Sequence, residues 1–119
     1  MQTFKFRSYG GYEVTFENDD ITINYAGEKK LFFSKSKPRT QIINLSEIKA
    51  VDYKEPGKLQ YGFVRFLTAQ NEQYLSSVYM AKHDADSFIV ETDEWSQTEK
   101  LFDLIRKKRK GVPFNKQKM

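Results

Sequence analysis

The chain has 119 residues, of which 39% are hydrophobic, and its 10 phenylalanines and 7 tyrosines are enough to fill the core of one domain. It has no cysteine, which excludes disulfides, thiolate metal sites and a cysteine nucleophile. The net charge of +4 is unevenly distributed, because residues 1–105 carry a net −3 whereas the last 14 residues carry seven bases and no acid. The absence of cysteine and of an apolar leader segment predicts a cytoplasmic protein.

Alternation of apolar and polar side chains predicts that most of the chain is β-structure. The clearest example is a hairpin, in which residues 12–16 and 21–25 alternate on either side of the turn residues 17–20. The full set of predicted strands is residues 1–8, 12–16, 21–25, 41–45, 50–54, 61–68, 73–79 and 87–90.

The segments between these strands carry turn and loop signals. The basic segment 26–39 predicts an extended connection or an irregular strand, Ser46 and Glu47 a short helical step, and residues 81–86 a loop. Residues 55–58 form a turn in which Gly57 suits a positive φ. Gly62 opens the next strand and predicts a close approach of neighbouring backbone or an aromatic ring.

One amphipathic helix is predicted over residues 93–110, with Thr92 or Asp93 as its N-cap. Acidic residues lie early in this segment and basic residues late, as the helix dipole favours, and Gly111 suits the position after the helix end. Residues 111–119 are then expected to be a flexible basic tail. Two sets of core residues are expected: Leu45 and Ile48 from the helical step, and Trp95, Phe102 and Ile105 from the helix.

Short strands followed by one helix predict an α+β, mainly β domain over residues 1–110. The expected architecture is a curled antiparallel sheet or barrel of about seven strands, capped at one open end by the C-terminal helix.

This arrangement resembles a pleckstrin-homology-like domain, and in particular the small bacterial modules of unknown function that often precede a short helical oligomerisation tail of the SHOCT type. The resemblance covers about residues 10–108 and is carried by residues 14–19, 43–51, 54–57, 62–68 and 87–90. It implies the fold and a module that assembles with other proteins. The chain departs from the pattern in its long basic segment 26–39 and in having a basic stub where the helical tail would follow.

No group of residues predicts catalysis. His83 is the only histidine, and its neighbours Asp84 and Asp86 suit a polar loop better than a metal site or a catalytic triad. The adjacent acids Asp19–Asp20 and Asp93–Glu94 fall in a turn and at a helix start, and no glycine-rich phosphate loop is present. We therefore expect no enzyme, no metal or cofactor site and no small-molecule substrate.

Two basic segments are the candidate contact sites for nucleic acid or an anionic membrane. The first contains Lys29, Lys30, Lys35, Lys37 and Arg39. The second contains Arg106, Lys107, Lys108, Arg109 and Lys110, and continues to residue 118. Phe32 and Phe33, within the first segment, are candidates for a protein interface, for core packing or for peripheral membrane contact.

The favoured hypothesis is a non-enzymatic protein-interaction module that self-associates, because an open sheet edge can accept a strand and the groove between sheet and helix can accept a peptide. The first alternative is an electrostatic binder of nucleic acid or anionic membrane through segments 29–39 and 106–118. The second is a small phage or mobile-element protein that inhibits a host complex.

Overall fold

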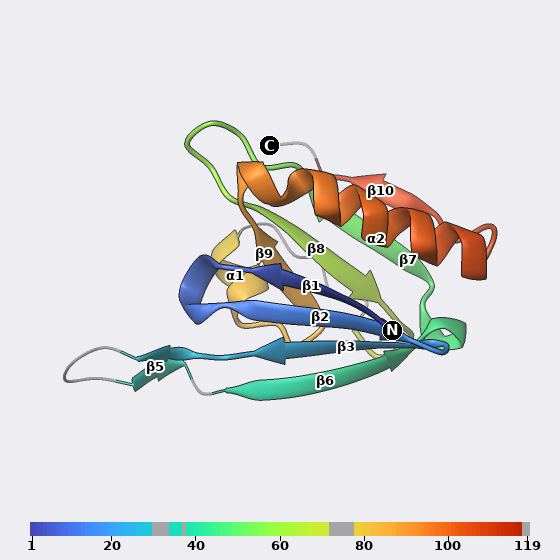
Figure 1. Ribbon diagram of the computed structural model, residues 1–119, viewed down its shortest axis with the longest axis horizontal. Coiled ribbons are helices and arrows are strands. Elements are labelled where there is room, and N and C mark those ends of the chain that lie inside the picture. The colour runs from blue at the N-terminus through green and yellow to red at the C-terminus, as the bar shows by residue number, and fades with distance from the viewer. Residues whose placement is uncertain (30–33, 37, 72–77, 118–119) are drawn as a thin grey trace.

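The computed structural model describes residues 1–29, 34–36, 38–71 and 78–117. The chain forms two four-stranded sheets, ordered β1-β2-β3-β6 and β10-β7-β8-β9, which are drawn in Figure 1. The first contains β1 (Gln2–Phe6), β2 (Tyr12–Glu17), β3 (Asp20–Tyr25) and β6 (Arg39–Asn44). The second contains β7 (Ala50–Lys54), β8 (Gly62–Leu67), β9 (Ser87–Val90) and β10 (Phe114–Lys116). The mainly β, α+β class is confirmed, although the two sheets do not close into a barrel.

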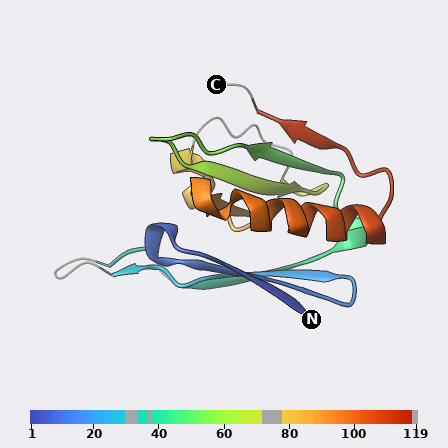
Figure 2. The ribbon, with the colours of Figure 1, turned by 45° about the horizontal axis from the view of Figure 1, so that its top comes forward.

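A long helix fills the opening along one side of the two sheets. It consists of a 3-10 turn, η3 (Thr92–Glu94), that leads directly into α2 (Trp95–Lys108). Figure 2 shows α2 running between the two layers. Its Gln97 side chain donates to the Lys5 carbonyl oxygen of β1 at 2.6 Å, while the Phe102 ring lies 5.3 Å from that of Tyr53 in β7. The helix therefore bridges the first and second sheets.

The helix begins differently from the prediction, which proposed Thr92 or Asp93 as N-cap. The Glu91 backbone N–H donates to the Glu94 carboxylate at 2.9 Å, whereas the Thr92 hydroxyl donates to the Gly57 carbonyl oxygen at 2.6 Å. Asp93 accepts from Arg7 at 2.7 Å. Both predicted caps are wrong because each side chain is used in a long-range contact instead.

The core lies between the sheets and follows the alternation in the sequence. In β2 and β3, alternate residues from Tyr12 to Tyr25 are buried while the intervening polar residues face outward. Leu45 and Ile48 are buried as expected. Of the helix residues expected in the core, Phe102 and Ile105 are buried, whereas Trp95 is half-buried and packs edge-on against Phe102.

Four short elements connect the strands: η1 (Ser8–Gly10), the pair β4 (Glu28–Lys29) and β5 (Ser34–Ser36), and η2 (Leu45–Glu47). The pair β4–β5 lies within the segment expected to be an irregular strand, and Figure 1 shows that it extends away from the body beyond β3 and β6. No helix within the described ranges is long and apolar enough to cross a membrane.

The connection from β8 to β9 differs from the prediction. Residues 73–79 were expected to be a strand and residues 81–86 a loop, but α1 (Val78–Lys82) is a short helix that overlaps both segments. Residues 72–77 lie outside the described part of the chain. Ala81 is fully buried, so one turn of helix places this small apolar residue in the core.

The C-terminal segment adds a strand that the sequence did not predict. Gly111, at φ 92°, reverses the chain after α2, and β10 then pairs in parallel with β7. The Val51 N–H donates to the Pro113 carbonyl oxygen at 2.9 Å, and Phe114 packs on Phe102 with ring centroids 4.9 Å apart. Residues 114–116 are therefore part of the sheet rather than of a flexible tail.

The two glycines of the β7–β8 connection have different roles. At Gly62, an added Cβ would lie 2.1 Å from the Lys54 carbonyl oxygen, which confirms the predicted close approach. Gly57 does not have the predicted positive φ. The turn instead closes with the Gly57 N–H donating to the Gln60 carbonyl oxygen at 3.0 Å, and this wider turn has no position that requires a left-handed residue.

Candidate interaction surface

The first basic segment surrounds the β4–β5 pair, with Lys29 at the end of β4 and Lys35 in β5. Four predicted site residues lie outside the described part of the chain: Lys30, Phe32, Phe33 and Lys37. Arg39 is held against the body of the domain. Its guanidinium carbon lies 4.6 Å from the centroid of the Tyr25 ring, and its Nη2 donates to the Asp84 carbonyl oxygen at 3.1 Å.

The second basic segment occupies the last turn of α2 and the residues after it, and both of its arginines are used in packing. The Arg106 guanidinium lies 4.2 Å from the centroid of the Phe114 ring. Arg109 donates to the carbonyl oxygens of Leu45, the first residue of η2, and of Ile48, which follows it. Lys116 pairs with Glu55 at 3.4 Å, and Lys118 lies outside the described part of the chain. Three bases are exposed and are joined by no ion pair to another described residue: Lys107, Lys108 and Lys110.

The two basic segments do not form one surface. In Figure 1 the β4–β5 pair projects at one end of the molecule, and the C-terminal turn of α2 lies at the opposite end. The longest dimension of the molecule is 46 Å. This dimension is several times the Debye length of about 8 Å at physiological ionic strength. The structure therefore presents two separate basic regions.

The histidine and its neighbouring acids contribute to contacts within the domain. Asp84 lies 3.3 Å from Nε of the buried Arg65, and Asp86 accepts from Gln41 Nε2 at 2.8 Å. The second contact joins β6 of the first sheet to the loop before β9 of the second. His83 itself is exposed, and the described residues contain no group of three potential ligands suited to a metal ion.

The four outer strands of the two sheets differ in how well their edges are protected. The edge of β1 is covered by α2 through the bond from Gln97 to Lys5. All four residues of β9 are buried, and β10 has only three residues, the last of which is Lys116. By contrast, β6 pairs with β3 in an unbroken register over six residues. The features with which proteins protect open edges are confined to its beginning, where Arg39 follows Pro38, and residues 40–44 contain no charge, proline or bulge.

The hydrogen bonds around β6 show which of its backbone groups face this open edge. The Leu45 N–H donates to the Asp19 carbonyl oxygen at 2.8 Å, at the point where β6 ends. In an antiparallel strand, successive residues direct their N–H and C=O groups to opposite sides. Gln41 and Ile43 therefore bond to β3, whereas Thr40 and Ile42 direct theirs away from it.

The end of β6 supports the same assignment. The Asn44 N–H also points away from β3, and it donates to the Glu47 carboxylate at 3.3 Å, so this position is already capped. Ile42 is 62% exposed on the outer face of the sheet, which is high for an isoleucine. Within the described part of the chain, no hydrogen bond engages the outward backbone groups of Thr40 and Ile42, and Ile42 adds an exposed apolar side chain.

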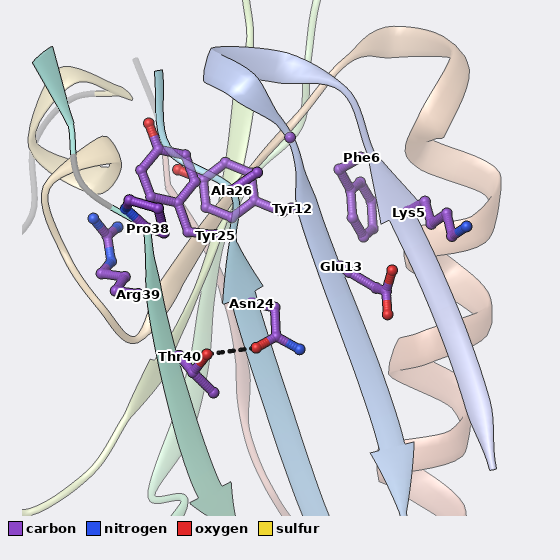
Figure 3. A pocket seen from close by; sticks show the side chains of 11 residues that line it. Lys5, Phe6, Tyr12, Glu13, Asn24, Tyr25, Ala26, Pro38, Arg39 and Thr40 are labelled. Carbon is purple, nitrogen blue, oxygen red and sulfur yellow. Dashed lines mark hydrogen bonds between the residues drawn. The ribbon is translucent and has the colours of Figure 1, made fainter. Parts of the chain in front are cut away.

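A hollow of about 660 Å³ lies at the end of the first sheet, beside the beginning of β6 (Figure 3). Arg39 and Thr40 form one side of it, and the Thr40 hydroxyl donates to Asn24 Oδ1 at 2.6 Å. The rings of Tyr12 and Tyr25 stack with centroids 4.7 Å apart at this end of the sheet. The hollow adjoins the open edge, so a segment bound along β6 would also pass beside it.

Thr40 and Ile42 were not among the predicted site residues. Apart from Phe32 and Phe33, the predicted site residues are charged, whereas the open edge is formed by uncharged residues of a β-strand. The sequence does contain an indication of an open edge, because residues 39–44 form a strand without lysine or proline. Its position at the edge depends on the strand order, which the sequence does not specify.

Comparison with known protein families gives one match. The family described as a domain of unknown function, DUF4429, matches residues 14–106. This region runs from β2 to the last turn of α2. No curated protein and no solved structure matches the chain.

Proposed function

We propose that this chain, which belongs to the DUF4429 family of domains of unknown function, is a non-enzymatic protein-interaction module. The observation that carries this proposal is the open edge of β6, with the outward-directed backbone groups of Thr40 and Ile42. An extended segment that aligns with β6 would satisfy these groups and continue the first sheet, which is the mode of recognition called β-strand addition.

The order of the elements supports a finer assignment, which is a pleckstrin-homology-like domain. Leaving aside the inserted β4–β5 pair, a four-stranded meander is followed by a three-stranded meander and then by α2. About seven strands followed by one C-terminal helix is what the sequence resemblance implies. The helix α1 and the strand β10 are additions to it.

Affinity capture with edge variants tests the proposed function. Ile42→Lys places a charge beside the open edge, and because Ile42 is 62% exposed the domain itself should remain folded. Thr3→Lys is the matched control, because Thr3, Thr15, Thr22 and Ile42 form one row across the outer face, with Thr3 at its far end. We expect capture of a protein partner, which includes an untagged copy of the chain, to survive nuclease treatment. This capture should be lost with Ile42→Lys and retained with Thr3→Lys.

Two results would contradict the proposal. One is that no protein is retained after nuclease treatment. The other is that every retained protein binds Ile42→Lys as well as it binds the wild type.

The exposed lysines at the end of α2 favour a second candidate function, electrostatic binding of nucleic acid or an anionic membrane. Lys107, Lys108 and Lys110 extend from the body without a described ion pair. Binding of this type falls steeply with salt. Replacement of all three by glutamate would then abolish capture, whereas Ile42→Lys would leave it unchanged.

A further inference from the structure

We infer that the strand added to β6 is β6 of a second copy of this chain, paired antiparallel about a two-fold axis at Gln41. This inference rests on the proposed function, because it identifies the occupant of the same edge. It is derived from the spacing along β6 of the backbone N–H and C=O groups that face the open edge.

An axis at Gln41 places Thr40 of one copy opposite Ile42 of the other, and Ile42 opposite Thr40. In both copies these residues direct their N–H and C=O groups away from β3. Such opposed residues exchange two N–H···O bonds in an antiparallel ladder. The symmetric pairing therefore satisfies the outward groups of both residues in both copies.

The ends of the edge are also self-complementary. With the axis at Gln41, Pro38 lies opposite Asn44 of the second copy. Proline has no N–H, and the Asn44 N–H is already bonded to Glu47 at 3.3 Å, so neither residue presents a donor that lacks an acceptor. An axis at Ile42 would allow the same number of backbone bonds, but it would place the Thr40 carbonyl oxygen of each copy opposite the already bonded Asn44 N–H and leave it without a donor.

The side chains are compatible with this arrangement. Residues 40–44 carry no charge, and Arg39 would lie opposite Ile43 of the second copy, so no residue of β6 faces a like charge across the pair. Thr40 and Ile42 project from the same outer face, and each exposed Ile42 would cover Thr40 of the other copy. The first sheets of the two copies would become one continuous sheet.

Cysteine substitutions test the register directly, because the chain has no cysteine of its own. Opposed residues in a non-hydrogen-bonded pair have Cα atoms about 4.5 Å apart, within the range that a disulfide spans. Gln41→Cys should therefore form a disulfide between copies under mild oxidation. In Ile42→Cys the diagonal separation would be about 7–8 Å, so cross-linking should be much slower, and Thr3→Cys should not cross-link.

Sedimentation equilibrium of the full chain provides the second measurement. We expect the wild type to pass from monomer to dimer with rising concentration, Ile42→Lys to raise the dimer dissociation constant roughly tenfold or more, and Thr3→Lys to leave it unchanged. Circular dichroism should show native β-structure in every variant.

A wild type that stays monomeric, an unchanged dimer in Ile42→Lys, or faster cross-linking at Ile42→Cys than at Gln41→Cys would overturn the inference. A monomeric chain that still captures a different protein in an Ile42-dependent manner would overturn self-pairing and leave the proposed function standing.

Discussion

Replacement of Gly62 by alanine is expected to lower the free energy of unfolding by about 3 kcal/mol. The added Cβ would lie 2.1 Å from the Lys54 carbonyl oxygen and 2.7 Å from the Pro56 nitrogen. Both atoms belong to the backbone, so β7 or β8 must shift to make room. Chemical denaturation of Gly62→Ala and the wild type would measure the difference.

Gly57→Ala is the matched control for this prediction. Gly57 lies in the same connection and also has an ordinary φ, but the nearest atom to an added Cβ there is Gln60 Cβ at 4.0 Å. We expect its effect to remain within about 0.5 kcal/mol. Gly62→Ala would contradict the close contact if it were equally mild.

Replacement of Glu94 by alanine is expected to cost about 3 kcal/mol. The Glu94 carboxylate is buried, and it accepts from the backbone N–H groups of Arg7 at 2.9 Å and of Glu91 at 2.9 Å. Alanine would leave these two donors without an acceptor and would remove the link between the end of β1 and the start of α2. The exposed Glu99, one turn later in the helix, provides the control, because Glu99→Ala removes the same charge without a described hydrogen bond.

This effect should depend on pH in a defined direction. Burial raises the pKa of Glu94 above its ordinary value, despite the opposing hydrogen bonds from Glu91 and Arg7. The folded state therefore binds the proton more tightly than the unfolded state, and the contribution of Glu94 falls as the pH rises from the ordinary glutamate pKa through the raised one. The stability difference between wild type and Glu94→Ala should accordingly be larger in acid than at neutral pH. A difference that grows towards neutral pH would contradict the raised pKa.

The strands that could be predicted are those in which one face is buried and the other is exposed. In β2 and β3 the alternation from Tyr12 to Tyr25 matches the burial residue by residue, so the predicted limits are nearly those observed. β10 could not be predicted in this way, because its three residues contain a single apolar side chain, Phe114. It is held by backbone pairing with β7, a contact between distant parts of the sequence.

The candidate surface was harder to predict than the fold. Charge runs are visible in a sequence, but the structure shows Arg39, Arg106 and Arg109 packed against the domain. An open edge is visible only once the order of the strands is known. The same limit applies to Thr92, whose hydroxyl bonds to Gly57, 35 residues earlier in the chain, and not to the start of the helix.

Amide hydrogen exchange at β6 tests the central claim, that this edge is the binding surface. In the isolated domain at low concentration, the amides of Thr40 and Ile42 should exchange quickly, while those of Gln41 and Ile43, bonded to β3, exchange slowly. Binding of a partner or of a second copy should slow Thr40 and Ile42, leaving Asn44, capped by Glu47, little changed. If association occurs and the amides of Thr40 and Ile42 exchange as fast as before, the binding surface lies elsewhere.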